Sequence, residues 1–155
     1  MITRTLAVLA PLAGAVLPLA DVPDPVFAQE LVGPGRAILP GVLEQTVSAP
    51  ISGVLRILTP HAFVVVGQDD RAVLVHLGVD AHSGRQPAAQ ALAQVGQQVS
   101  AAEPILSWLP SRTDPALHNA CPVVALDAIP KALLGAHQGD ISAGKHLFSW
   151  QTGGS

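Results

Sequence analysis

Residues 72–80 read A-V-L-V-H-L-G-V-D. The apolar, β-branched run predicts a strand, and His76 is the one imidazole in it, near the C-terminal end. Gly78 follows, where the missing Cβ lets another backbone or a partner approach closely. Asp80 closes the stretch with a carboxylate. We expect the chemistry of the protein to be centred on this strand.

A second apolar run with a histidine at one end lies upstream, over residues 59–66, and reads T-P-H-A-F-V-V-V. The residues between the two runs, 67–70, read G-Q-D-D and suit a turn. If the runs are neighbouring antiparallel strands, His61 and His76 come within reach of each other across the ladder. The sequence therefore predicts a histidine pair on a rigid sheet.

The composition indicates one packed domain that is mainly β. The chain has 155 residues, of which 49% are hydrophobic and 12% charged, so it can bury a sizeable core. Its 14 Gly and 14 Pro are scattered without a period, which favours many short strands joined by turns.

Charge and cysteine content exclude several classes of protein. The net charge is −3, and three Phe, two Trp and no Tyr leave little for base stacking, so we expect no nucleic-acid partner. The single cysteine, Cys121, has no partner for an internal disulfide and fits a reduced, cytoplasmic compartment as a small buried hydrophobe. No apolar run reaches the roughly 18 residues that a membrane-spanning helix needs.

A short pattern, A-P-x-x-G-x-x, occurs at residues 10–16 and again at 49–55, 39 residues later. Both copies enter a strand through a Pro-and-Gly turn, which predicts an internal duplication within one antiparallel β-sandwich or barrel. The apolar stretch 6–20 resembles a signal peptide in position, but Pro11, Gly14 and Pro18 interrupt it. Because it contains one copy of the repeat, we expect it to be part of the fold.

The remaining elements follow from local patterns. Residues 87–94 (P-A-A-Q-A-L-A-Q) form the best helical stretch, and residues 41–48 suit a loop or an edge strand. A loop or short helix is expected at 111–119 and a helical turn at 129–134. Strands are expected at about 52–58, 62–66, 72–77, 97–100, 104–108, 121–126 and 145–150. We therefore expect one domain over 1–150 with few short helices, and a flexible tail at 151–155.

Four blocks in one order give the chain a family resemblance. They are A-P-L-A-G with D-V-P-D-P-V-F-A (10–14 and 21–28), V-G-P-G-R-A-I-L-P (32–40), T-P-H-A-F (59–63) and V-H-L-G-V-D (75–80). With these blocks the chain resembles the glucose-family enzyme IIA of the bacterial phosphoenolpyruvate-dependent sugar phosphotransferase system. Weaker echoes continue to about residue 149, so the resemblance covers nearly the whole chain.

The resemblance implies a phosphocarrier on an antiparallel β-sandwich. It implies that His76 accepts a phosphoryl group from the phosphocarrier protein HPr and passes it to a cysteine of the IIB domain of a sugar permease. It also implies that His61 supports the phosphoryl group and that the hydroxyl of Thr59 orients His61. Sugar recognition would belong to the membrane IIC partner.

The resemblance also places a shallow apolar docking surface around the histidines. Asp24 and Asp80 would face arginines of HPr, and the other residues implied in partner binding are Val26, Phe27, Leu31, Val32 and Gly78. The chain departs from the family at Pro60, where a polar residue is frequent, and at Leu77, where Phe is frequent. It also lacks the usual pattern of the final strand after Lys145.

The residues themselves suit this chemistry. A neutral imidazole, with an ordinary pKa of about 6.5, is a nucleophile near pH 7 and forms a labile bond to phosphorus. A second imidazole can donate a hydrogen bond to the phosphoryl oxygens. We expect no cofactor to be required, although His61 and His76 together could also bind a zinc ion incidentally.

Three other interpretations start from the same residues. The pattern H-x-G-x-D at 76–80 also occurs in lysostaphin-like zinc peptidases, but the H-x-H pair that completes their site is missing downstream. A biotinyl or lipoyl carrier needs a lysine at a hairpin tip, and Lys131 and Lys145 do not fit one. A non-catalytic regulatory or binding descendant of the IIA fold is the remaining alternative.

Overall fold

The computed structural model describes residues 4–79 and 88–152, and every strand pairing in these residues is antiparallel. The strands are β1 (Arg4–Leu9), β2 (Gly14–Pro18), β3 (Gly35–Leu39), β4 (Gln45–Ser48), β5 (Gly53–Leu58), β6 (Ala62–Val66), β7 (Ala72–His76), β8 (Ala88–Ala91), β9 (Gln98–Val99), β10 (Pro104–Leu109), β11 (Cys121–Ala125), β12 (Leu133–Leu134), β13 (Gly139–Ile141) and β14 (His146–Thr152).

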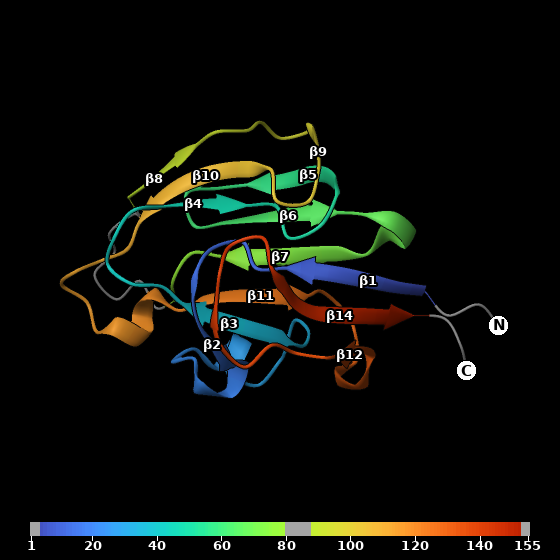
Figure 1. Cartoon of the computed structure of the whole chain (residues 1–155), viewed down its shortest axis with the longest axis horizontal. Coiled ribbons are helices and arrows are strands. Elements are labelled where there is room, and N and C mark those ends of the chain that lie inside the picture. The colour runs from blue at the N-terminus through green and yellow to red at the C-terminus, as the bar shows by residue number, and fades with distance from the viewer. Residues whose placement is uncertain (1–3, 80–87, 153–155) are drawn as a thin grey trace.

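These strands form one large and two small sheets (Figure 1). The large sheet has the order β13-β2-β3-β11-β7-β6-β5-β9, and the small sheets have the orders β1-β14-β12 and β4-β10-β8. The prediction of a mainly β, antiparallel fold is confirmed. The strands expected at 52–58, 62–66, 72–77, 97–100, 104–108, 121–126 and 145–150 are all present within two residues of their expected ends.

The helix predicted within residues 87–94 is wrong for the described residues. Ala88–Ala91 form β8, which pairs with β10 in the register Leu106↔Ala91 to Leu109↔Ala88. Alanine and glutamine favour a helix by a few tenths of a kcal/mol per residue, which is a weak preference. The open edge of β10 offers backbone hydrogen bonds along the whole segment, and this tertiary pairing overrides the local preference.

The C-terminal strand is longer than the sequence indicates. β14 runs through Gln151 and Thr152, which pair with Thr5 and Arg4 of β1, so these two residues are part of the sheet rather than of a tail. The strand expected at 145–150 is present as a seven-residue strand that begins at His146, although the sequence after Lys145 departs from the family's usual pattern there. Residues 153–155 lie outside the described part.

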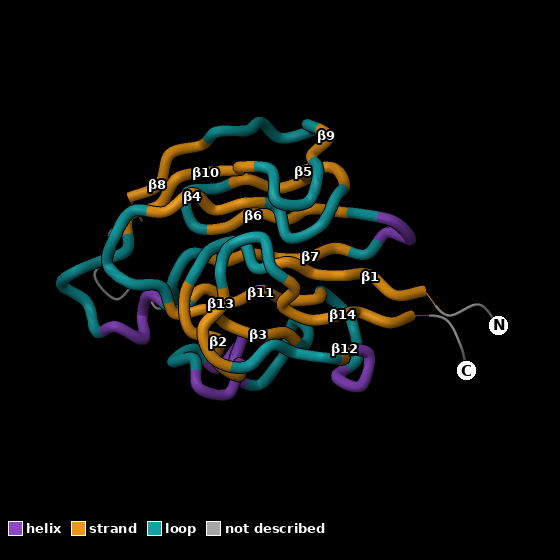
Figure 2. Tube along the Cα trace, viewed as in Figure 1, coloured by secondary structure: helices purple, strands orange, loops and turns teal. Residues whose placement is uncertain are grey.

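The helices are short and lie at the periphery of the strands (Figure 2). They are η1 (Leu19–Asp21), α1 (Pro25–Ala28), η2 (Gln68–Asp70), η3 (Ala116–Asn119) and η4 (Pro130–Ala132). Among the described residues, no helix has the length and apolar character needed to cross a membrane.

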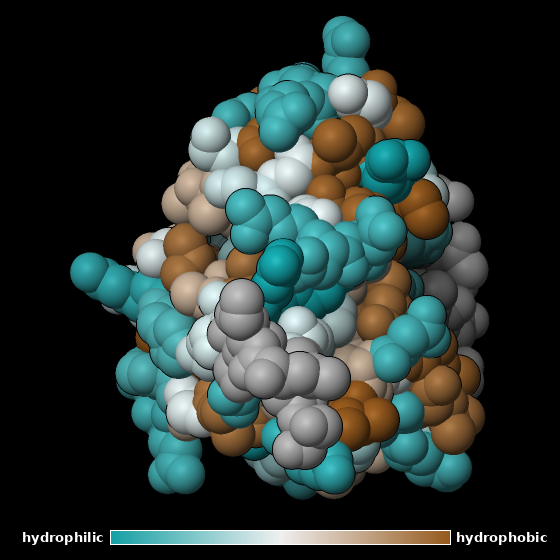
Figure 3. Space-filling model, turned by 90° about the vertical axis from the view of Figure 1, so that its right-hand side faces the viewer, coloured by the Kyte–Doolittle hydropathy of each residue, from teal (hydrophilic) through white to brown (hydrophobic). Residues whose placement is uncertain are grey.

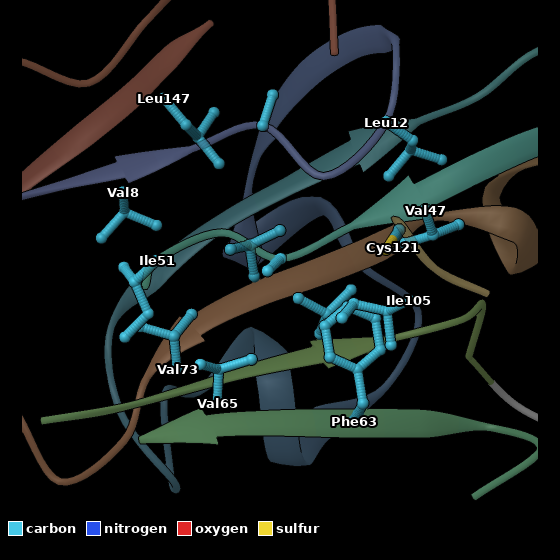
Figure 4. Close-up of a cluster of buried hydrophobic side chains, with 14 of the residues drawn as sticks. Val8, Leu12, Val47, Ile51, Phe63, Val65, Val73, Ile105, Cys121 and Leu147 are labelled. Atoms are coloured by element: carbon cyan, nitrogen blue, oxygen red, sulfur yellow. The ribbon is translucent and has the colours of Figure 1, made fainter. Parts of the chain in front are cut away.

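The large sheet buries side chains on both of its faces. Along β7, Val73 and Val75 point into the main core, which Figure 4 shows with Phe63 and Ile105 among its members. The alternate residue Leu74 packs instead against a second, smaller cluster on the opposite face. That second cluster contains Leu19, Val22, Phe27, Ala37, Val79, Ala120 and Val124. Because side chains alternate along a strand, His76 lies on the face of the second cluster.

The internal duplication is visible as reciprocal hydrogen bonds. Leu9 N–H donates to the carbonyl of Pro50, and Ser48 N–H donates to the carbonyl of Pro11, each at 2.9 Å. The donors are 39 residues apart, and so are the acceptors. Each repeated strand begins with a glycine that a neighbouring backbone approaches closely. A Cβ on Gly14 would lie 2.3 Å from the carbonyl oxygen of Leu39, and a Cβ on Gly53 would lie 2.2 Å from that of Val66. The prediction of two related β units is therefore supported by contacts.

A second pair of equivalent segments escaped the sequence pattern. β13 pairs with β2 at Gly14, as β9 pairs with β5 at Gly53. Each is followed by a tight turn, S-A-A-E at 100–103 and S-A-G-K at 142–145. The third residue of both turns has a positive φ, 72° at Ala102 and 82° at Gly144. The two turns therefore adopt the same backbone with different residues at the left-handed position.

The β6–β7 turn is tied to the terminal strands through a buried arginine. Arg71 is 6% exposed, donates from Nη1 to the carbonyl of Trp150 at 2.8 Å and lies over the Trp150 ring at 5.7 Å. Asp69 contacts both Arg71 and Arg4. Figure 3 views this end of the molecule, where polar side chains separate the apolar ones into patches. The contacts of Arg71 with Trp150 and of Asp69 with Arg4 hold the small sheet of β1 and β14 against the large one.

The two equivalent turns give a matched stability test. We expect Ala102→Gly to raise the free energy of unfolding by about 0.5–1 kcal/mol, because it removes left-handed strain on a residue with a Cβ. We expect Gly144→Ala to lower it by about 1 kcal/mol, since its new Cβ meets only ordinary contact, 3.9 Å from that of Ala102, and the backbone strain remains. Urea denaturation measures both changes. Equal signs for the two variants would contradict the shared turn geometry.

Candidate functional site

His61 and His76 are brought together by the pairing of β6 with β7. His76 is the cross-strand partner of Ala62, and Leu77 N–H donates to the carbonyl of His61 at 2.7 Å, so the ladder continues one step beyond the strands. His61 is close enough to lower the pKa of His76 through its charge. The sequence predicted that a β-hairpin brings the two histidines close together, and the structure places them in this way.

The ring of His76 is held by a hydrogen bond to the backbone. Its Nδ1 lies 2.6 Å from the carbonyl oxygen of Gly78. A carbonyl oxygen can only accept, so Nδ1 carries the proton and donates it. In the neutral ring Nε2 then has no proton and keeps its lone pair. The ring is fixed in the tautomer whose far nitrogen is a nucleophile.

Gly78 makes this hydrogen bond possible by its conformation. Its φ is +72°, in the region that L-residues with a Cβ disfavour, and a Cβ there would lie 2.7 Å from the carbonyl oxygen of His118. The same carbonyl accepts a hydrogen bond from Val79 N–H at 2.8 Å. The turn after β7 therefore needs glycine, and this role of Gly78 in orienting His76 could not be read from the sequence.

The surroundings of His76 favour the neutral imidazole. Burial is the largest cause and lowers the pKa of His76 below its ordinary value of 6.5. The hydrogen bond to Gly78 and the carboxylate of Asp24 act in the opposite direction, whereas the charge of His61 lowers the pKa further. Because the net shift of this pKa is downward, His76 is neutral at pH 7.

The helical turn α1 covers one side of the His76 ring. Asp24 caps it, accepting a hydrogen bond from Val26 N–H at 2.9 Å, and Pro25 occupies the first turn, where a missing N–H costs nothing. This cap turns Phe27 inward, so that its ring lies 5.2 Å from the His76 ring at an angle of 58°. Asp24 is therefore both a structural cap and a charge that acts on His76.

The predicted docking residues differ in their exposure. Val26 and Leu31 are 42% and 65% exposed, Val32 is half-buried, and Phe27 is buried in the second cluster. Asp80 lies outside the described residues. One apolar residue was missed: Ile57 is 50% exposed and pairs with Val64 on the sheet face of His76. A β-bulge at this point of β5 breaks the alternation, so no period-two pattern could have revealed it.

Thr59 contacts His61 through the backbone. Its hydroxyl oxygen accepts hydrogen bonds from the N–H groups of His61 and Ala62, each at 3.1 Å, and lies 3.3 Å from the carbonyl of Ala62. These bonds form a cap at the start of β6 and fix the position from which the His61 side chain projects. Thr59 thus contacts His61 through the main chain, and its role in orienting the His61 ring stays a prediction.

The remaining candidates have ordinary surroundings. Cys121 is fully buried in the main core, and burial raises the pKa of its thiol. Leu77 is buried, whereas Pro60 is exposed. In the part of the chain that the structure describes, no three His, Cys, Asp or Glu side chains are grouped so that they could hold a metal ion.

Comparisons with known proteins find a matching family model and a matching solved structure. Residues 6–128 match the family model described as the phosphoenolpyruvate-dependent sugar phosphotransferase system, EIIA 1. Over 94% of its length the chain superposes on 96% of the glucose permease IIA from Mycoplasma capricolum, with a TM-score of 0.80 and 25% sequence identity.

Two curated relatives are named as glucose-specific EIIA components of this system. The protein from Oceanobacillus iheyensis is 38% identical over 79 residues, which are 50% of this chain and 47% of the relative. The protein from Staphylococcus aureus is 32% identical over 109 residues, which are 69% of this chain and 64% of the relative. The chain thus spans between about half and two thirds of the length of these relatives.

The burial of His76 can be tested by titration. We expect the pKa of His76, followed by NMR, to lie below 6.5 in the wild type and to rise toward 6.5 in Phe27→Ala, because removing the ring readmits water and burial is the main cause of the shift. Ile129→Ala, at an exposed apolar residue away from α1, is the control and should leave the titration unchanged. An unchanged pKa in folded Phe27→Ala would contradict this explanation.

Proposed function

The chain belongs to the EIIA 1 family of the phosphoenolpyruvate-dependent sugar phosphotransferase system, and from this premise we propose that it is a phosphocarrier for sugar uptake. In this proposal Nε2 of His76 accepts a phosphoryl group from HPr and passes it to a cysteine of the IIB domain of a sugar permease. The observation that carries it is the hydrogen bond from His76 Nδ1 to the Gly78 carbonyl, which leaves Nε2 as the free nucleophile.

The two transfers balance without another reactant. In the first, the Nε2 lone pair forms a bond to phosphorus while the bond between phosphorus and the donor breaks, and the donor keeps that electron pair. In the second, the acceptor thiolate forms a bond to phosphorus and the P–Nε2 bond breaks, which restores neutral His76. While phosphorus is bound to Nε2, the ring carries positive charge, which the Gly78 carbonyl stabilises at Nδ1–H.

His61 is proposed to act on the phosphoryl oxygens. Its backbone is fixed by Thr59 on one side and by Leu77 N–H on the other, so its ring projects from a rigid point beside His76. A ring N–H there can donate to the oxygens that gain charge as phosphorus moves between carriers. Transfer between carriers of similar phosphoryl potential needs no strong electrophile, so we propose that the site works without a resident metal or cofactor.

The surface around the histidines is proposed as the docking site for both carriers. Exposed Val26, Leu31 and Ile57 supply apolar area, and Asp24 adds a negative charge that can attract arginines of HPr. A short-lived complex needs this kind of small apolar patch with few charges. We propose that these encounters occur in the cytoplasm.

Phosphorylation with a cognate enzyme I, HPr and phosphoenolpyruvate tests the proposal. Intact-mass analysis at alkaline pH should show one added phosphoryl group on the wild type and none on His76→Ala. His61→Ala should still be labelled but should transfer the group to a IIB domain far more slowly. His146→Ala, at an exposed histidine of β14, is the control and should behave as the wild type.

A wild type that stays unlabelled while a known EIIA protein is labelled by the same reagents would overturn the proposed function. Labelling that persists in His76→Ala would move the site to another residue.

A further inference from the structure

The loop between β10 and β11 is closed by one buried amide. The side chain of Asn119, 7% exposed, accepts a hydrogen bond at Oδ1 from Ser111 N–H at 3.0 Å and donates from Nδ2 to the Ser111 carbonyl at 2.7 Å. The hydroxyl of Ser111 in turn accepts from Asp114 N–H at 3.1 Å. The two ends of residues 111–119 are thus fastened to each other by the Asn119 side chain.

This loop presses on the turn that orients His76. The carbonyl of His118, next to Asn119, accepts the hydrogen bond from Val79 N–H, and its oxygen lies only 2.7 Å from the position that a Cβ on Gly78 would take. On the other side of Asn119, Ala120 is buried in the second cluster together with Val79. Both neighbours of Asn119 in the chain therefore hold the segment that follows β7.

A continuous series of contacts joins the amide to the reactive ring. It runs from Ser111 through Asn119 to the His118 carbonyl, then to the Gly78–Val79 backbone, and from the Gly78 carbonyl to Nδ1 of His76. Glycine adopts positive φ about as readily as negative φ, so its own preference does not fix the peptide group between Gly78 and Val79. Neighbouring groups must hold this peptide group in place. The His118 carbonyl is the neighbour that does so here.

We propose that Asn119 is a positioning residue for His76. By closing the 111–119 loop it holds the His118 carbonyl against the Gly78 turn, which keeps the Gly78 carbonyl aimed at Nδ1 and so keeps Nε2 unprotonated. Asn119 does not touch the transferred group. The effect on the ring is a property of the fold, whereas the effect on phosphoryl transfer rests on the proposed function.

The test compares the ring tautomer in variants of the loop. With ¹⁵N-labelled histidine, two-bond ¹H–¹⁵N correlation at a pH above 7 should show the Nδ1–H form of His76 in the wild type. Asn119→Ala should shift the His76 signals toward a mixture with the Nε2–H form. Phosphorylation of His76 should slow about 10- to 100-fold, the range expected when a reacting group is misplaced by about 1 Å.

Two further variants separate positioning from a general loss of stability. Asn119→Asp keeps the shape and the bond from Ser111 N–H but sets a carboxylate oxygen against the Ser111 carbonyl, so it should also shift the tautomer. Arg112→Gln alters an exposed side chain of the same loop and should match the wild type. Folded Asn119→Ala and Asn119→Asp proteins with the wild-type tautomer would overturn the proposal, even if transfer were slowed.

The outcomes also separate this inference from the proposed function. A tautomer shift in the Asn119 variants of a protein whose wild type is never phosphorylated would support the positioning role and count against the phosphocarrier. A phosphorylated wild type with no tautomer shift in the variants would support the phosphocarrier and count against the positioning role of Asn119.

Discussion

The site depends on one short hydrogen bond, from Nδ1 of His76 to the carbonyl of Gly78 at 2.6 Å. It decides which nitrogen of the ring carries the proton, and therefore which nitrogen can react. Three features of the fold serve this bond: a glycine with positive φ, a carbonyl from the 111–119 loop behind that glycine, and a buried aromatic ring beside the imidazole. Each belongs to a different segment of the chain, so the tautomer is a product of the tertiary structure.

The large sheet makes room for this arrangement because both its faces are apolar. The main core fixes β6, β7 and β11 from one side, while the second cluster, with Phe27 and Val79, supports the histidine side. A histidine on such a face loses much of its hydration, and this loss lowers its pKa. The surrounding apolar residues that are left exposed, Val26 and Ile57 among them, serve the proposed docking of partners.

The main strands and the pairing of the two histidines could be predicted from the sequence, because both depend on local patterns. Apolar runs rich in β-branched residues predicted the strands, and the G-Q-D-D turn predicted the hairpin that pairs the histidines. The strand Ala88–Ala91 could not be predicted, since an alanine-rich segment is helical by preference and only the edge of β10 makes it a strand. The role proposed for Asn119 could not be predicted either, because it depends on which loop packs behind Gly78.

The position of phosphorus on the ring tests most directly whether the hydrogen bond from His76 to Gly78 selects the nucleophile. Phosphorylated protein with ¹⁵N-labelled histidine can be examined by NMR for coupling between ³¹P and ¹⁵N. We expect one phosphohistidine, at His76, with phosphorus coupled to Nε2 and a proton retained on Nδ1. Phosphorus on Nδ1 of His76, or on another residue, would contradict this expectation, because the hydrogen bond to Gly78 would then not select the nucleophile.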